Sequence, residues 1–168
     1  MFLSLRCLYR IVHLSANAQI CKGKKTGISS TVIVSDGFKK TYHSLLNNIL
    51  FMLDSNMYGA GNFFTGFDVI HDDQIQWYEK QIEKYRDEKG NPPSSLAFFH
   101  MPLAEYKEAW NKLRFGSKEV EYKMGAVGES DNYMGISRKK GNFFQKAVDL
   151  GSTKGIFVGH DHLNTISM

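Results

Sequence analysis

Three histidines of this 168-residue chain come directly after short apolar runs. His100 follows the run 96–99, and His160, with His162 two residues later, follows the run 156–158 and one glycine. Neutral imidazole is a common ligand of zinc, iron and manganese-class ions, and a His-x-His pair on a turn directs two imidazoles to the same neighbourhood. Apolar packing does not require imidazole at these positions. The pattern therefore predicts a metal site.

A His-x-His pair alone is more often a surface pair without a ligand. The combination with His100 favours a site, because all three histidines stand where a buried strand is expected to end. Gly159 is predicted to let the backbone bend where a larger residue would crowd the site. The other histidines, His13, His43 and His71, lack this context and are interpreted as ordinary surface or satisfied side chains.

The elements that must position these histidines alternate between strands and helices. Apolar runs predict strands over 49–53, 95–99 and 155–158. Amphipathic patterns predict helices from a cap at Asp72 or Asp73 to near Gly90, from Leu103 to Leu113, and from a cap at Asn142 to Gly151, with a long loop over 114–140. Helices between buried strands imply a parallel α/β sheet, and its functional crevice lies at the carboxyl ends of the strands. The histidines are thus expected on one rim.

The net charge of +4 is unevenly distributed along the chain. Residues 1–40 hold seven Lys and Arg against one acid, whereas residues 41–168 hold fourteen against sixteen. The main body is therefore not expected to bind nucleic acid. Residues 1–40 form a basic N-terminal segment, interpreted as a transit-peptide-like sequence or as a disordered or wrongly assigned start. Residues 41–168 form the domain. No apolar run reaches the roughly 18–20 residues of a membrane span, so a soluble protein is expected.

Two motifs containing these histidines resemble a known family. They are Phe98-Phe99-His100-Met101-Pro102-Leu103 and Val158-Gly159-His160-Asp161-His162-Leu163-Asn164, with further matches at Leu53-Asp54-Ser55, Asp73-Gln74-Ile75-Gln76-Trp77-Tyr78 and Gly128-Glu129-Ser130. They resemble the last two metal motifs of calcineurin-like metallophosphoesterases, most closely in the branch related to purple acid phosphatases. The similarity runs from about residue 49 to residue 164 in the family's order.

The resemblance implies part of an αββα sandwich, about half of the four-layer fold. It also implies hydrolysis of a small phosphomonoester by a hydroxide that bridges two metal ions, with iron, manganese or zinc as the candidates. By position, His100 and His160 would bind the second metal and His162 the first. Asp161 is not a ligand in the family pattern and is expected to order the turn, and Asp54 is expected to have a structural role.

The motifs of the family's first half do not occur in this sequence. These are Asp-x-His, Gly-Asp-x-x-Asp, and Gly-Asn-His followed by an acid, which carry the bridging aspartate, an asparagine and the general acid in the family pattern. Three neutral imidazoles cannot offset the mutual repulsion of two divalent ions. We therefore expect a fragment that is truncated at both ends, binds at most one ion weakly, and catalyses little by itself.

Two alternatives follow from the same residues. A non-catalytic remnant could use the half-sheet as a binding or interaction module, because exposed strand edges favour association. Three histidines could instead form a mononuclear zinc hydrolase, which predicts one tightly bound metal per chain.

Overall fold

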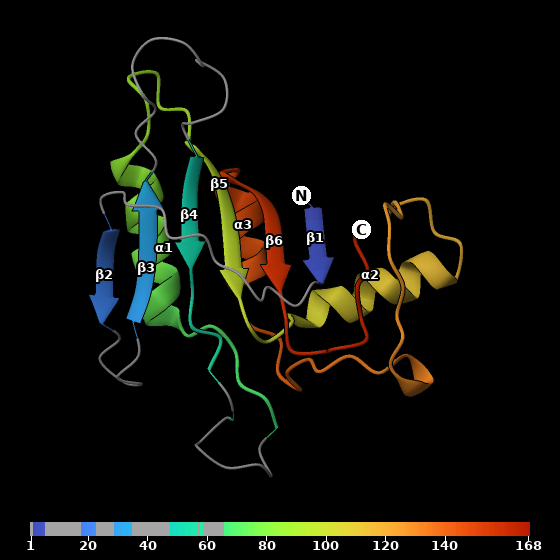
Figure 1. Ribbon diagram of the computed structural model, residues 1–168. Helices are drawn as coiled ribbons and strands as arrows, with labels where there is room; N and C mark the ends of the chain where they lie inside the picture. The colour runs from blue at the N-terminus through green and yellow to red at the C-terminus, as the bar shows by residue number, and fades with distance from the viewer. Residues whose placement is uncertain (1, 6–17, 23–28, 35–47, 57, 59–65) are drawn as a thin grey trace.

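The computed structural model describes residues 2–5, 18–22, 29–34, 48–56, 58 and 66–168. Its strands form one sheet in the order β1-β6-β5-β4-β3-β2 (Figure 1). The strands are β1 (Phe2–Leu5), β2 (Ala18–Lys22), β3 (Ser29–Val34), β4 (Asn48–Met52), β5 (Ser94–Phe99) and β6 (Thr153–Val158). The helices are α1 (Asp72–Lys84), α2 (Ala104–Arg114) and α3 (Phe143–Leu150), with a short 3-10 turn, η3, at Ser130–Asn132.

The sheet contains the parallel strands that the apolar runs predict. β4 pairs in parallel with β5, and β5 with β6, so that Phe51, Ala97 and Ile156 stand side by side across three strands. β1 adds a parallel strand beside β6, and β3 and β2 continue the other edge in antiparallel orientation. The predicted α/β class is confirmed, and the architecture agrees with part of a metallophosphoesterase fold.

Three strands lie within residues 1–40, the basic segment that we separated from the domain because of its composition. β1, β2 and β3 are all hydrogen-bonded into the common sheet. Composition did not indicate them, because the segment is basic and its apolar residues do not form one long run. The domain boundary near residue 40 stays a prediction.

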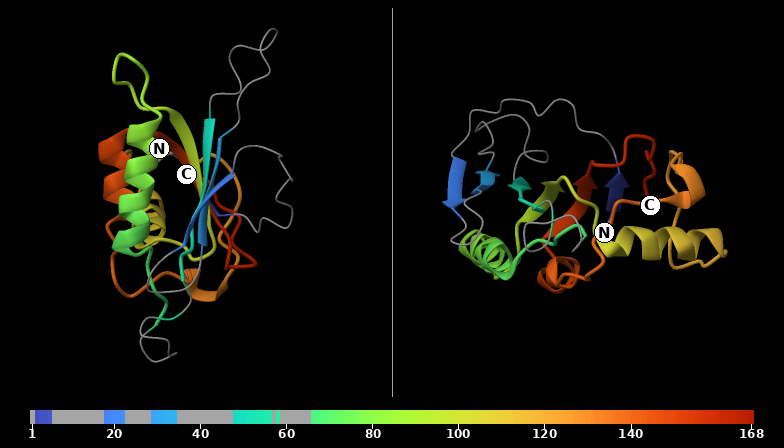
Figure 2. Two further views of the ribbon diagram at one scale, coloured as in Figure 1. Left: turned by 90° about the vertical axis from the view of Figure 1, so that its left-hand side faces the viewer. Right: turned by 90° about the horizontal axis from the view of Figure 1, so that it is seen from below.

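Helices α1 and α3 lie on the same face of the sheet (Figure 2). Strand residues alternate between the two faces, and the set that points toward these helices is buried. The core consists of Ile49, Phe51, Ala97, Phe99, Ile156 and Val158 from the sheet, and Ile75, Tyr78, Ile82, Phe143 and Ala147 from the helices. The apolar periodicity of α1 and α3 therefore faces the strands that carry the histidines at their ends.

Helix α1 begins and ends at residues other than those predicted. His71 is its N-cap, without a side-chain hydrogen bond, whereas Asp72 and Asp73 occupy the first turn, where acids complement the helix dipole. The helix ends at Lys84 and not near Gly90. The Asp87 carboxylate accepts hydrogen bonds from the backbone N–H groups of Lys89 and Asn91. This local turn competes with helix continuation, which explains the earlier end.

The other two helices agree with the sequence pattern to within a residue at their ends. α2 spans Ala104–Arg114. α3 begins after Asn142 and ends at Leu150, and its C-cap, Gly151, adopts the left-handed conformation with φ 65°. Asn142 stands at the predicted cap position but its side chain makes no capping hydrogen bond. Within the described ranges, no helix has the length and apolarity needed to cross a bilayer.

The predicted loop over 114–140 runs alongside the C-terminal end of the chain. Isolated bridges pair Met124 with Ser167 and Val127 with Asn164. These bridges place the segment that precedes η3 against the residues that follow β6.

We predict that Tyr78→Phe destabilises the fold and reduces its sensitivity to alkali. The fully buried Tyr78 hydroxyl lies 2.6 Å from Thr153 Oγ1 and joins α1 to β6, so its loss should lower the free energy of unfolding by roughly 1 kcal/mol. Burial raises the pKa of Tyr78 to about 12. The stability from the neutral hydroxyl is complete below about pH 10, the ordinary tyrosine pKa, and is lost as the pH rises toward 12.

Urea unfolding of both proteins at pH 8 and between pH 10 and 12 checks this. The wild-type protein should lose more stability across the alkaline interval than Tyr78→Phe. Equal losses would contradict the assignment.

Candidate metal centre

Two of the three predicted ligands meet at the carboxyl ends of β5 and β6. His100 follows Phe99, the last residue of β5, and the N–H of Gly159 donates to the His100 carbonyl at 3.1 Å. His160 Nδ1 lies 3.3 Å from His100 Nε2, and the ring centroids are 5.2 Å apart with an interplanar angle of 87°. The parallel pairing of β5 and β6 therefore brings together two imidazoles that are sixty residues apart in sequence.

The third predicted ligand, His162, is exposed beyond the turn. Across the residues that the structure describes, no group of three or more His, Cys, Asp or Glu side chains is close enough to hold a metal ion. The His-x-His spacing predicts that both imidazoles point to one place, but the backbone at His160 turns in the left-handed region, with φ 71°. The assignment of His100, His160 and His162 as ligands remains a prediction.

The crowded glycine of this site is Gly135 and not Gly159. A Cβ added to Gly159 would meet its nearest neighbour, His100 Nδ1, at 3.4 Å, which is ordinary van der Waals contact. A Cβ added to Gly135 would lie 2.2 Å from His160 Cδ2 and 2.8 Å from Asp161 Oδ1. The prediction that Gly159 is required for space is therefore wrong. The strained turn residue is His160 itself, since a non-glycine residue rarely has a positive φ.

The buried Asp161 carboxylate holds Gly135 against the histidine. The Gly135 N–H donates to both carboxylate oxygens, at 3.1 and 3.0 Å, and Asn164 Nδ2 donates to Oδ2 at 3.1 Å. Asp161 is only 5% exposed, so these donors replace the water that the carboxylate would otherwise need. Asp161 thus orders the turn, as expected. It does so by binding the backbone of Gly135, in a segment that no sequence pattern linked to Asp161.

Asn164 connects the same turn to two other parts of the chain. Its side-chain oxygen accepts from the N–H groups of Gly128 and Glu129, and its amide donates to the Tyr133 carbonyl at 2.9 Å. Asn164 is 1% exposed. The Glu129 carboxylate in turn accepts from the Leu163 N–H at 3.2 Å. Both residues match the family motifs, and in this structure both support the loop that carries His160.

His160 is electrostatically suited to be a neutral imidazole. Partial burial lowers its pKa below the ordinary value, and the nearby His100 and His162 lower it further, while the Asp161 carboxylate acts in the opposite direction. A neutral ring keeps one nitrogen lone pair available for a metal ion. The Phe67 ring packs edge-on against His160 with centroids 4.8 Å apart. Sequence reasoning missed both Gly135 and Phe67, because no motif or period connects them with His160.

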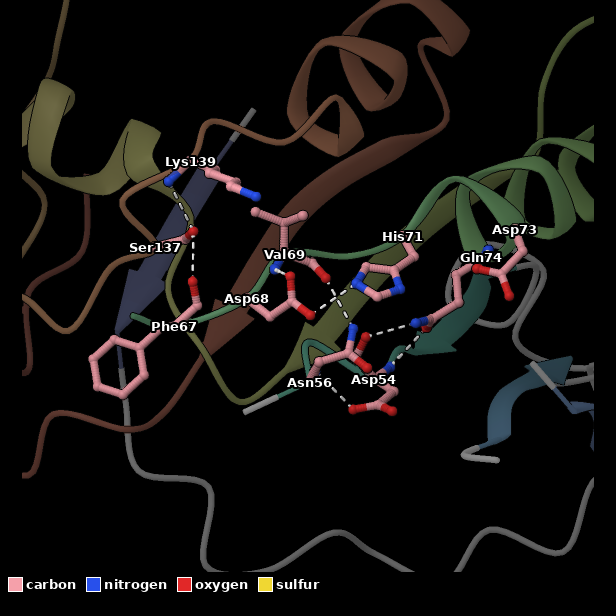
Figure 3. A network of polar contacts seen from close by, with 10 residues as sticks. All are labelled: Asp54, Asn56, Phe67, Asp68, Val69, His71, Asp73, Gln74, Ser137 and Lys139. Carbon is pink, nitrogen blue, oxygen red and sulfur yellow. Dashed lines mark hydrogen bonds and ion pairs between the residues drawn. The ribbon is translucent and has the colours of Figure 1, made fainter. Parts of the chain in front are cut away.

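The loop after β4 has a structural role in this rim (Figure 3). The Asp54 backbone N–H donates to the Gln74 side chain, and the Asp54 carboxylate accepts from the Asn56 N–H. Ser55 Oγ accepts from the Met101 N–H at 2.8 Å, which ties this loop to the residue after His100. His71, at the start of α1, lies 2.8 Å from the Asp68 carboxylate and takes no part in the histidine pair.

Comparisons with known proteins find phosphatase-like relatives of this chain. The chain is 32% identical over 128 residues to a protein named "Probable inactive purple acid phosphatase 29" from Arabidopsis thaliana. It is 35% identical over 121 residues to "Phosphatase DCR2" from Saccharomyces cerevisiae, and 32% identical over 131 residues to "Probable inactive purple acid phosphatase 14" from Arabidopsis thaliana. The chain is related to the purple acid phosphatase-like metallophosphoesterases.

The alignments cover only part of this chain and only part of each relative. These alignments cover 72%, 68% and 73% of the chain but 30%, 19% and 29% of the three relatives. The chain therefore spans less than a third of the length of each of these curated relatives and is related to the C-terminal part of the metallophosphoesterase domain. No family model matches the chain, and no solved structure matches it.

We predict that Gly135→Ala disrupts the histidine pair whereas Gly159→Ala does not. The new methyl group at 135 would overlap His160, which should displace the ring and lower the free energy of unfolding by about 1–3 kcal/mol. The methyl group at 159 makes only ordinary contact, so its effect should stay within about 0.5 kcal/mol. Denaturant unfolding and imidazole NMR resonances of His100 and His160 report both effects. A larger shift in Gly159→Ala would contradict the steric assignment.

We also predict that Asn164→Ala loosens the turn that carries His160. The substitution removes the acceptor of two N–H groups and the donor to Tyr133 and Asp161, at a site that is 1% exposed. The buried polar groups that lose their hydrogen-bond partners should lower the free energy of unfolding by about 1–3 kcal/mol. Faster amide hydrogen exchange at Gly135 is the specific readout. Unchanged exchange there would show that the turn does not depend on Asn164.

Proposed function

We propose that this chain forms the histidine-bearing part of a metal-dependent phosphoester hydrolase that acts on phosphomonoesters. The observation that supports it most directly is the 3.3 Å separation of His100 Nε2 and His160 Nδ1 at the ends of adjacent parallel strands. The relationship to proteins named as phosphatases supports the class of reaction. A crevice at the carboxyl ends of parallel strands is also where α/β proteins commonly bind ligands.

The two imidazoles fit one edge of a metal coordination shell. Zinc–nitrogen bonds of about 2.0–2.1 Å at the tetrahedral angle place two ligand nitrogens about 3.3 Å apart. The observed separation of 3.3 Å is close to this value and is also a hydrogen-bond distance, in which the tautomers set donor and acceptor. A catalytic site needs at least three protein ligands, and the described residues bring together only two. They fit an ion only in part, so we derive no catalytic step through it.

The residues of this chain would act as binding and positioning groups. His100 and His160 would each offer one nitrogen, and His162 would complete the set after a change in the turn. Asp161 and Asn164 would keep the His160 loop in place through Gly135 and Tyr133. A bound divalent ion would supply positive charge for a phosphoryl oxygen. By itself, the chain is proposed to bind at most one ion weakly and to turn over little substrate.

Metal titrations of the chain and its variants test this proposal. Calorimetry with zinc or manganese should show one weak site, and His100→Ala or His160→Ala should each weaken it at least roughly tenfold, since each removes one of few ligands. His71→Ala is the matched control, because His71 pairs with Asp68 away from the histidine pair. Unchanged affinity in both site variants would overturn the assignment. The effect of His162→Ala on metal affinity would show whether His162 is a third ligand.

Hydrolysis of an aryl phosphate with manganese, iron or zinc tests the catalytic part separately. Metal binding without turnover would mean that the chain holds an ion but lacks the remainder of the active site. Turnover that is abolished in His160→Ala would assign activity to this chain.

A second candidate function is a non-catalytic binding module. Two relatives are named as probable inactive purple acid phosphatases, and the described residues gather only two of the three predicted ligands. Such a module would bind a partner through the edge strands of its sheet. Light scattering after size-exclusion chromatography, together with a thermal melt, distinguishes the binding module from the hydrolase. A monomer that melts cooperatively would argue against it.

A further inference from the structure

The turn formed by η3 has a backbone conformation that few side chains adopt. Two successive residues that are not glycine, Asp131 and Asn132, have positive φ angles of 52° and 56°. The N–H of Tyr133 donates to the Ser130 carbonyl at 2.9 Å and closes the turn. Asparagine and aspartate tolerate the left-handed region better than other side chains, but such a conformation persists only where surrounding contacts hold it. The turn therefore requires an anchor.

A tryptophan of α2 provides this anchor. Trp110 donates its indole Nε1–H to Asn132 Oδ1 at 3.3 Å, across 22 residues of sequence. The Trp110 ring packs against the hydrophobic core. On the preceding turn of α2, the fully buried Tyr106 donates its hydroxyl to the Ile156 carbonyl of β6 at 2.9 Å. Helix α2 is thus fixed to β6, and the segment that contains η3, orange in Figure 1, lies beside it.

The other end of the turn is attached to the loop that carries His160. The Tyr133 carbonyl accepts from Asn164 Nδ2 at 2.9 Å. The same amide donates to the Asp161 carboxylate at 3.1 Å, and that carboxylate accepts the Gly135 N–H. Gly135 in turn packs against the His160 ring. A continuous set of contacts therefore leads from α2 to this imidazole.

The two residues with positive φ differ in what their side chains contact. Asn132 is half-buried and accepts the indole N–H of Trp110. Asp131 is exposed, and in the part of the chain that the structure describes its carboxylate has no hydrogen bond or ion pair. Both residues share the backbone conformation, but only Asn132 connects it to α2. Asp131 is therefore a matched control for Asn132.

We infer that Asn132 is a positioning residue for the histidine pair. Its side chain, held by Trp110, fixes the turn, and the turn places the Tyr133 carbonyl where Asn164 reaches it. Asn132 contacts neither imidazole and acts through Asn164 on the loop that carries His160. The metal-binding role of the pair rests on the proposed function, and Asn132 adds to it a control of the geometry of the pair from α2.

Asn132→Gly tests this role, because glycine keeps the positive φ and removes only the acceptor. In the metal-free chain, the imidazole resonances of His160 should shift. Amide hydrogen exchange at Gly135 should quicken about 3–10-fold, as for the loss of one hydrogen bond. Asn132→Asp retains an acceptor oxygen and should keep the wild-type exchange rate. Wild-type resonances and exchange in Asn132→Gly would overturn the inference.

Asp131→Gly and unfolding measurements separate positioning from stability. Asp131→Gly relieves the same kind of strain without touching the Trp110 contact, so it should leave His160 and Gly135 unchanged. In Asn132→Gly, relief of strain offsets the lost hydrogen bond, and the free energy of unfolding should stay close to the wild-type value. A loss of stability in Asn132→Gly with unshifted His160 resonances would show a structural role alone and contradict positioning.

Trp110→Phe tests the contact from the other side. The substitution removes the indole N–H and retains an aromatic ring in the core. It should shift the His160 resonances in the same direction as Asn132→Gly, and the double variant should show no further shift. Shifts that add in the double variant would mean that the two residues act independently and would refute the anchor.

Zinc titrations distinguish this role from the proposed function. A His160 ring that moves in Asn132→Gly, in a chain that binds no zinc, would support the positioning role and contradict the hydrolase. Zinc binding that requires His100 and His160 but is unchanged in Asn132→Gly, with unshifted resonances, would support the metal site and contradict the positioning role.

Discussion

The contact between the buried Asp161 carboxylate and the Gly135 N–H supports the whole rim of this protein. Both carboxylate oxygens accept from that one N–H group, and Asn164 donates to the same carboxylate. A buried carboxylate requires such donors, because burial without them is costly. The requirement fixes the segment 133–138 against the turn after β6. This segment in turn packs against the His160 ring through Gly135.

This constraint explains why the tight position of the site lies outside its motif. His160 adopts a left-handed backbone conformation, which puts its ring against the backbone of residue 135. A Cβ at position 135 would overlap the His160 ring and the Asp161 carboxylate, so a larger residue there requires these side chains to shift. The strain at His160 is sustained by surrounding hydrogen bonds, as is common where a structure positions a functional side chain. Asp161 and Asn164 therefore act on the site through the backbone they hold.

The histidine pair is the part of the proposed metal site that the described residues bring together. Adjacent parallel strands end in His100 and His160, whose nitrogens are spaced like two ligands of one ion. The described residues add no carboxylate or third imidazole to that pair. Charge is the physical limit, because neutral imidazoles alone cannot compensate a second divalent ion.

Much of the central architecture could be predicted from local patterns. The apolar runs before His100 and His160 indicate buried strands, and the 3.6-residue periodicity of α1 and α3 indicates the helices that cover them. Parallel pairing then follows from chain order, and it places both histidines on one rim. The resemblance of the motifs to metallophosphoesterases identified the same residues. These inferences succeed because strand and helix patterns are local and because β5 and β6 are neighbours.

Other features depend on contacts between residues that are distant in sequence. Neither composition nor spacing shows that Gly135 lies against His160, that Phe67 packs on the same ring, or that Ser137 holds the Phe67 carbonyl. Nor does the pattern show that His160 has a left-handed backbone conformation and that His162 is exposed. The sequence by itself determined which residues could bind a metal and which strands present them. Only the tertiary structure decided what packs around them, because the buried Asp161 carboxylate takes its N–H donor from Gly135, in a loop that has no pattern of its own.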